Sequence, residues 1–173
     1  VAKRYRPVVG RVAYLVAHRQ SDAAGEDAAR THGIAAALNG AGFDTLCFDC
    51  QRDTGAGKER LHPASADATI EGVRYIQCCG RWPQLRDAPE HLQQNVAHFE
   101  ELLRVFRPEF VLGAADWAVN LPAWVAARRL GLPFFHEVRG FPEHARGAGQ
   151  PGYAQTQAYQ EQQARDTFVA RQA

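Results

Sequence analysis

The feature that most constrains the fold is residues 110–140, which predict a strand, a helix and a second strand. Residues 110–114 and 134–138 are short apolar runs, typical of strands buried on both faces. Residues 122–130 form an alanine-rich run that ends on two arginines and is followed by a glycine, as at many helix C-termini. Two buried strands joined by a helix form a right-handed crossover, so we expect the two strands to be parallel.

The same alternation of strands and helices runs through the rest of the chain. Further strands are predicted at 11–17, 44–49 and 72–78. Further helices are predicted at 28–41, 91–106 and 153–171. Polar residues, glycines and prolines predict loops at 51–68, 80–89 and 141–152. Five strands alternating with helices predict an α/β fold. We expect a doubly wound, mostly parallel Rossmann-like sheet in the order 3-2-1-4-5, with helices on both faces.

Composition narrows the class of protein. The chain has 173 residues, of which 46% are hydrophobic and 23% charged, which suits one globular domain with its own core. The net charge of +1 gives no reason to expect nucleic acid as a partner. No apolar run approaches the length of a transmembrane helix.

The four cysteines have three interpretations, a metal site, disulfides or reduced thiols, and disulfides would need an oxidising compartment that nothing in the sequence suggests. Cys47 and Cys50 have C-x-x-C spacing, and Cys78 and Cys79 are adjacent on a strand predicted to neighbour theirs. A zinc site needs a tetrahedron of ligands, which two adjacent cysteines rarely supply together. The remaining interpretation is reduced cysteines near strand ends, and we predict no metal site.

Polar side chains follow the fourth and fifth predicted strands, at the point where each strand ends. Asp116 and Trp117 come after the fourth strand, and Glu137 and Arg139 lie at the end of the fifth. In open parallel sheets, ligands bind beyond the carboxyl ends of the strands. We therefore expect the functional site at this edge of the sheet.

Four segments, taken in order, resemble one known family. They are VAYLVAH at 12–18, GEDAARTHG at 25–33, the stretch from Asp116 through ARRLGLP at 127–133 to EVRG at 137–140, and the tail from Gly152 with its last helix. This ordered set resembles the N-terminal, acceptor-side domain of glycosyltransferase family 4 (group 1), enzymes with the two Rossmann-like domains of the GT-B fold. The resemblance covers nearly the whole chain.

The resemblance implies a retaining glycosyltransferase of the hexosyltransferase type. Such an enzyme transfers a sugar from a nucleotide-sugar donor to a glycan or lipid-linked acceptor, here in surface polysaccharide biosynthesis. The nucleotide-sugar is a co-substrate, and no cofactor or metal is implied. The implied location is cytoplasmic, with peripheral association at the inner membrane surface left open.

The resemblance also implies a division into domains. Residues 1–173 correspond to a single Rossmann-like N-terminal domain, and the C-terminal nucleotide-sugar-binding domain is absent from this chain. We therefore expect the chain to be inactive by itself. Its expected partners are the donor, the acceptor and the missing domain, with no nucleic acid.

The resemblance assigns the following site residues. The substrate-binding set is Gly25, Glu26, Trp117, Glu137, Arg139 and Gly140, and the catalytic candidates are His18 and Asp116. The family often has a second glycine where this chain has Glu26, so a carboxylate stands near the expected diphosphate.

Several of these residues keep a second interpretation. Asp116 contacts sugar hydroxyls or caps the following helix. Trp117 stacks on a sugar or packs in the core. Arg139 binds an anionic acceptor or phosphate, or forms a plain ion pair with Glu137. His18 is a base or hydrogen-bonding group at the first strand's end, or a structural histidine.

The alternative function is a stand-alone Rossmann-like binding module without catalysis. A nucleotide-sugar epimerase is disfavoured because no G-x-G-x-x-G follows the first strand. The Tyr-x-x-x-Lys pair of the short-chain dehydrogenase group is also missing, since lysine occurs only at positions 3 and 58.

Overall fold

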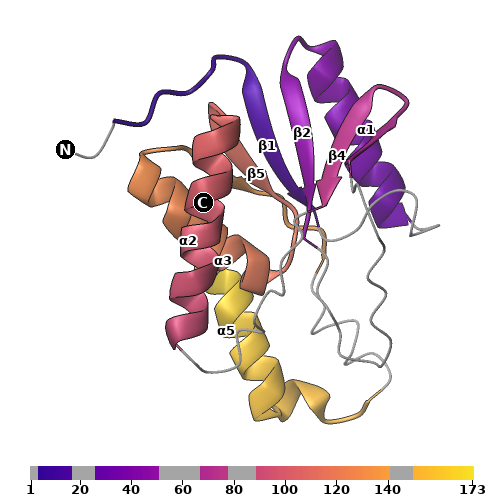
Figure 1. The fold of residues 1–173 in the computed structure, drawn as a ribbon. Coiled ribbons are helices and arrows are strands. Elements are labelled where there is room, and N and C mark those ends of the chain that lie inside the picture. Colours follow the sequence, from indigo (N-terminus) through magenta and orange to yellow (C-terminus); the bar gives the residue numbers. More distant parts are fainter. Residues whose placement is uncertain (1–3, 17–25, 51–66, 78–88, 141–149) are drawn as a thin grey trace.

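The computed structural model describes residues 4–16, 26–50, 67–77, 89–140 and 150–173. Within these residues six strands form one sheet in the order β3-β4-β2-β1-β5-β6 (Figure 1). The strands are β1 (Arg11–Val16), β2 (Asp44–Asp49), β3 (Asp67–Ile70), β4 (Val73–Gln77), β5 (Phe110–Gly113) and β6 (Phe134–His136). The helices are α1 (Glu26–Gly40), α2 (Pro89–Phe106), α3 (Trp117–Leu130) and α5 (Gln157–Gln172), with a short 3-10 helix η1 (Tyr153–Gln155) before α5.

The predicted fold class and strand order are confirmed. The five parallel strands stand in the order β4-β2-β1-β5-β6, which is the 3-2-1-4-5 order expected from the sequence. The sheet differs from the prediction at one edge, where β3 pairs antiparallel with β4. Part of β3 had been assigned to a loop, because its four residues are half polar and too few to show a clear alternation.

The β3–β4 hairpin turns on two residues, Glu71 and Gly72. Both have positive φ, 45° and 82°. Two consecutive residues with positive φ between paired strands are typical of a type I′ turn, whose twist matches that of the strands. Glutamate is an unusual residue at the first of these positions, so the usual Asn-Gly or Asp-Gly signal was missing from the sequence.

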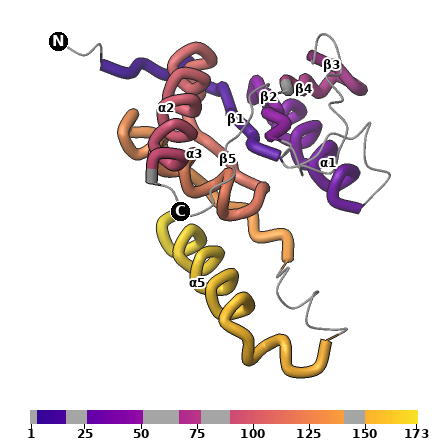
Figure 2. The backbone as a smooth tube through the Cα atoms, turned by 60° about the horizontal axis from the view of Figure 1, so that its bottom comes forward, coloured from indigo at the N-terminus to yellow at the C-terminus, as the bar shows by residue number. Residues whose placement is uncertain are grey.

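Helices cover both faces of the sheet. Figure 2 shows α1 on one side of the strands and α2 and α3 on the other. Strand β1 is buried from Val12 to Val16, and its side chains alternate between the two faces. Ala13 and Leu15 belong to the cluster under α2 and α3, whereas Tyr14 and Val16 pack on the α1 side.

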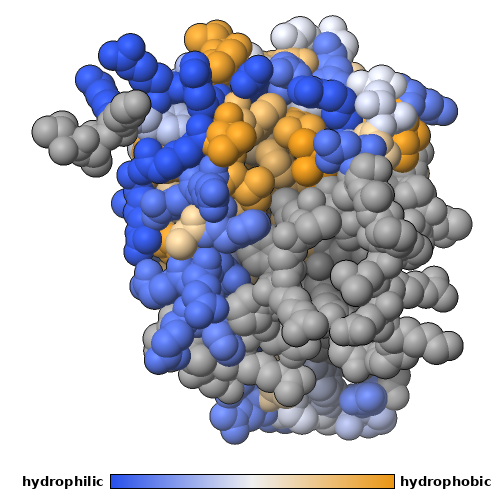
Figure 3. All heavy atoms as spheres, viewed as in Figure 1, coloured by the Kyte–Doolittle hydropathy of each residue, from blue (hydrophilic) through white to orange (hydrophobic). Residues whose placement is uncertain are grey.

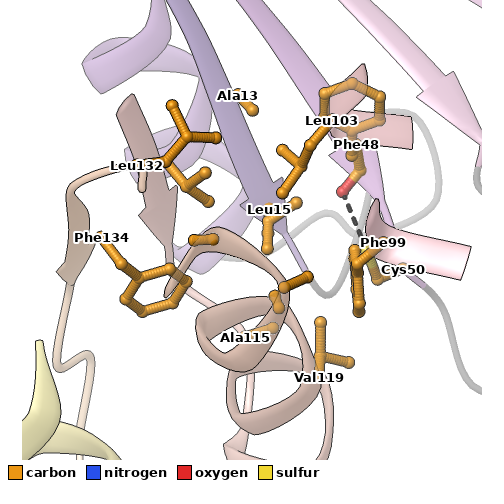
Figure 4. Close-up of a cluster of buried hydrophobic side chains, with 14 of the residues drawn as sticks. Ala13, Leu15, Phe48, Cys50, Phe99, Leu103, Ala115, Val119, Leu132 and Phe134 are labelled. Atoms are coloured by element: carbon orange, nitrogen blue, oxygen red, sulfur yellow. Dashed lines mark hydrogen bonds between the residues drawn. The ribbon is translucent and has the colours of Figure 1, made fainter. Parts of the chain in front are cut away.

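The larger core cluster lies between the sheet and the helices α2 and α3. In Figure 4, Leu15 of β1 points into the space that Phe99 of α2 and Val119 of α3 also fill. These side chains are at most 5% exposed. Burying each one stabilises the fold by about 1.5–3 kcal/mol.

Helix α3 begins five residues earlier than predicted. Asp116 caps it, accepting hydrogen bonds from the backbone N–H groups of Ala118 and Val119, and Gly131 with φ 72° ends it. The alanine-rich run predicted a helix only from Pro122, whereas the capping interpretation of Asp116 places the start at Trp117. Instead Pro122 lies inside the helix, at the cost of one backbone hydrogen bond.

The last helix packs on α3 through a few residues. Val169 is its one buried residue, while Phe168 and Trp124 of α3 form an edge-to-face pair. The Trp124 indole N–H also donates to the Gln172 carbonyl, 3.1 Å away. In Figure 2, the C-terminal end of α5 lies near α3, and the rest of the helix extends away from α2 and α3.

Hydrophilic residues cover most of the described surface on the face shown in Figure 3, with one apolar patch beside α2. None of the helices in the described ranges combines the length and the apolar character that a membrane crossing requires.

Candidate functional site

A cluster of largely buried polar side chains joins β1 to the residues that follow β6. The Tyr14 hydroxyl donates to Glu137 Oε2 at 2.7 Å. Arg139 Nη2 donates both to the Tyr14 oxygen, at 2.6 Å, and to Glu137 Oε2, at 3.1 Å. Since β1 and β6 flank β5 in the sheet, this group lies at the carboxyl ends of the central strands, where the sequence predicted the site.

The same arginine reaches across to α1. Arg139 Nη1 donates to Thr31 Oγ1 at 2.6 Å and to the Asp27 carbonyl at 3.0 Å. Arg30, on the same helix, places its Nε 3.1 Å from Glu137 Oε1. We call Tyr14, Arg30, Thr31, Glu137 and Arg139 the Glu137 cluster. It ties the first turns of α1 to the chain after β6.

Burial and charge together set the protonation of the cluster. The side chains of Glu137 and Arg139 are 13% and 14% exposed. Burial alone would raise the pKa of Glu137. Hydrogen bonds from Tyr14 and Arg139, together with the charges of Arg139 and Arg30, outweigh it and hold that pKa below its ordinary value. Glu137 is therefore a carboxylate at neutral pH.

Tyr14 and Arg139 keep their protons for related reasons. Burial raises the pKa of the Tyr14 phenol, and its hydrogen bond to Glu137 adds to that effect. Burial would lower the pKa of Arg139, but Glu137 and Tyr14 raise it. At neutral pH, both residues act as hydrogen-bond donors to a fixed negative charge.

The other predicted residues at this edge have partners of their own. Asp116 Oδ1 accepts from the backbone N–H groups of Ala118 and Val119, at 3.1 and 3.3 Å, so its predicted capping role is confirmed. The ring of Trp117 is half-buried, and the Arg165 guanidinium stands 4.8 Å from its centroid. Arg165 therefore already occupies a stacking position on this indole.

The remaining predicted residues contribute less to the described site. Glu26 is the exposed first residue of α1, and Gly140 is exposed one residue beyond Arg139. His18 and Gly25 lie outside the described residues. The structure therefore brings Glu137 and Arg139 together and places Asp116 and Trp117 after the strand between β1 and β6.

Sequence reasoning missed Tyr14, Arg30 and Thr31 as members of the site. A signal was present for Tyr14, because a tyrosine inside a wholly buried strand needs a partner for its hydroxyl. Its alternation with Ala13 and Leu15 also fixed the face on which that partner had to lie. Thr31 carried no such signal, since a threonine in a helix commonly bonds to its own backbone, as Thr31 does to the Asp27 carbonyl at 2.8 Å.

The described cysteines, Cys47 and Cys50, are both buried. Cys47 lies near the cluster, and burial raises its pKa to about 12, with Arg139 opposing the change. Cys78 and Cys79 lie outside the described residues, so the arrangement of all four stays a prediction. Among the residues that the structure describes, no group of three or more His, Cys, Asp and Glu side chains is arranged to hold a metal ion.

Fold and site together define a Rossmann-like α/β domain with a polar site at the carboxyl ends of its parallel strands. The family model described as "Glycosyl transferase 4-like domain" matches residues 28–173. The chain therefore belongs to the glycosyl transferase 4-like family, as its resemblance predicted, and is a glycosyltransferase domain. A comparison with curated proteins gave no match.

Proposed function

We propose that this chain is the acceptor-side domain of a retaining GT-B glycosyltransferase of the hexosyltransferase type. In this proposal the enzyme transfers a sugar from a nucleotide-sugar to a glycan or lipid-linked acceptor during surface polysaccharide biosynthesis. The observation that carries the proposal is the Glu137 cluster, an ionised carboxylate held beside two guanidinium groups at the ligand-binding edge of a glycosyl transferase 4-like domain.

The cluster suits the orientation of a sugar. A carboxylate accepts hydrogen bonds from hydroxyl groups, and a guanidinium donates to hydroxyl oxygens. Transfer requires that the acceptor hydroxyl be aimed at the anomeric carbon, because correct orientation removes much of the entropic barrier. A carboxylate fixed by Tyr14 and Arg139 meets this need better than a mobile side chain, since little freedom is lost when the substrate binds.

Donor binding belongs to the same proposal. We place the nucleotide of the donor on a second domain, because the resemblance described above implies that this chain is the acceptor side of a two-domain cleft. The nucleotide-sugar acts as co-substrate with no further cofactor or metal, and the reaction takes place in the cytoplasm, at or near the inner membrane surface. His18 and Asp116 stay the catalytic candidates, and Gly25, Glu26 and Gly140 stay candidate substrate contacts.

Calorimetry with UDP-, GDP- and ADP-linked sugars tests the division of labour. The titrations use the 173-residue chain and the complete product of its gene. We expect binding to the complete product and none to the 173-residue chain. Tight binding to the 173-residue chain alone would contradict the acceptor-side assignment and favour a self-sufficient binding module.

Sugar transfer by the complete product tests the site. We expect Glu137→Ala to lower transfer at least tenfold, since one lost hydrogen bond to a charged group corresponds to about 1.5–3 kcal/mol. Arg129→Gln is the matched control, because Arg129 forms a half-exposed ion pair with Glu100 between α3 and α2. Equal activity of Glu137→Ala and Arg129→Gln would show that Glu137 takes no part in the reaction.

A further inference from the structure

The hydrogen bonds of Arg139 leave no outward-facing donor. Its Nη1 donates to Asp27 and Thr31, and its Nη2 donates to Tyr14 and Glu137, so the four terminal N–H groups are all engaged. Its Nε is buried and has no hydrogen-bond partner among the described residues. A ligand could therefore bind the terminal nitrogens of Arg139 only by breaking bonds within the cluster.

Glu137 differs because its atom without a hydrogen bond is a terminal oxygen that lies beside a half-exposed side chain. Its Oε2 is engaged by Tyr14 and Arg139, but Oε1 accepts no hydrogen bond from any described residue and is buried. The group beside Oε1 is Arg30, whose Nε lies at 3.1 Å without the alignment of a hydrogen bond. A carboxylate oxygen can accept two hydrogen bonds, so Oε1 keeps unused acceptor capacity.

Arg30 is the movable part of this arrangement. Its side chain is 51% exposed, against 13% for Glu137, and its long stem allows many rotamers. An ion pair with one partner in solvent is worth little, about 0–1 kcal/mol. A ligand can therefore displace Arg30 from Oε1 at small cost, and the displaced guanidinium remains close enough to donate to the same ligand.

The charges around Arg30 disfavour a phosphate. Glu26 and Asp27 are exposed carboxylates in the first turn of the same helix, and Glu137 adds a third negative charge. Arg30 and Arg139 supply two positive charges, of which Arg139 is engaged with Glu137. A neutral group that both donates and accepts hydrogen bonds fits this surrounding better than an anion.

We infer that Glu137 Oε1 and Arg30 bind hydroxyl groups of a neutral sugar ring. One hydroxyl donates to Oε1, and Arg30 donates to an oxygen of the same ring after it has moved aside. Tyr14 and Arg139 do not touch the sugar. They are positioning residues that keep Glu137 ionised and hold its side chain in one orientation. This inference rests on the proposed function, and it assigns the neutral-sugar contact to Arg30 in place of Arg139.

Arginine-detected NMR tests the inference on the 173-residue chain. The probes are the methyl α-pyranosides of glucose, galactose and mannose, with inorganic phosphate as the anionic comparison. We expect at least one pyranoside to shift the Nε–Hε signal of Arg30 in a saturable way and phosphate to leave it unchanged. Arg30→Gln should weaken pyranoside binding about tenfold or more, whereas Arg129→Gln should leave it unchanged.

The positioning role has its own readout, the pH dependence of pyranoside binding. The wild-type chain should keep its affinity to a lower pH than an ordinary glutamate would allow, because the pKa of Glu137 is held below its ordinary value. Tyr14→Phe removes one of the hydrogen bonds that lower the pKa of Glu137, so its binding should fall off at a higher pH. A purely structural tyrosine would reduce binding equally at every pH.

Three results would overturn the inference. The first is that no pyranoside shifts the Arg30 signal. The second is saturable phosphate binding that Glu137→Gln strengthens, which would make Arg30 an anion site. The third is the same pH profile for Tyr14→Phe and the wild type. Each is independent of sugar transfer by the complete gene product, so failure of this inference and failure of the proposed function are distinguishable.

Discussion

Replacing Tyr14 by phenylalanine removes one oxygen from the centre of the Glu137 cluster and keeps the ring in the core. The hydroxyl donates to Glu137 at 2.7 Å and accepts from Arg139 at 2.6 Å. Both partners are charged and nearly buried, so water has little access to replace the lost bonds. A hydrogen bond to a charged group contributes about 1.5–3 kcal/mol, and we expect Tyr14→Phe to lower the free energy of unfolding by that amount.

Tyr75 of β4 provides a matched control. It is 1% exposed, lies on the same face of the sheet as Tyr14, and its hydroxyl pairs with His32 Nδ1 at 3.0 Å. Tyr75→Phe removes this one hydrogen bond, whereas Tyr14→Phe removes two, so Tyr75→Phe should cost less, about 0.5–1.5 kcal/mol. Urea unfolding of the two variants and the wild type at pH 7 measures both costs.

The cost of Tyr14→Phe should also depend on pH. Because the pKa of Glu137 is lowered in the folded state, its contribution to stability is present above the ordinary value of 4.5. That contribution is lost as the pH falls through the folded-state pKa. The substitution raises the folded-state pKa toward 4.5, so its cost should be largest at neutral pH and smaller in acid. A cost no larger than that of Tyr75→Phe, or one that is the same at pH 7 and below the folded-state pKa, would refute this account.

Three further predictions concern packing, capping and reactivity. Gly113→Ala should destabilise the chain by about 1–3 kcal/mol in urea unfolding, because an added Cβ would lie within 2.7 Å of two side chains. Gly33→Ala, which places its Cβ in open space on α1, should instead stabilise the chain by about 0.5–1 kcal/mol. Equal signs for the two would contradict the packing argument. Asp116→Ala should cost about 0.5–2 kcal/mol in the same assay, and Asp116→Asn, which can still cap α3, should cost less. Cys47 should resist iodoacetamide in the folded chain at pH 8 and react in urea, as followed by mass spectrometry, because burial raises its pKa to about 12; equally fast labelling in both states would argue against its burial.

The order of the parallel strands could be derived from the sequence because most of the strands are short apolar runs followed by a helix. Such a repeat leaves few topologies once crossovers are right-handed. The location of the site followed from the same rule, since Glu137 and Arg139 come directly after β6. The edge strand β3 and the first residues of α3 did not follow. A four-residue half-polar strand and a helix start with proline inside it give weak local signals.

Which atoms of the site remain open to a ligand was decided by tertiary structure alone. The sequence placed Arg139 at this edge, but its terminal N–H groups donate to Tyr14 and to two groups of α1 that are 108 or more positions away along the chain. Hydrogen bonds between such distant residues depend on how a helix lies over a sheet, and no local pattern encodes that placement. The sequence by itself therefore determined the fold class, the strand order and the edge that carries the candidate site. Only the folded chain decided that the terminal nitrogens of Arg139 bond within the cluster and that Glu137 Oε1, beside Arg30, accepts no hydrogen bond from a described residue.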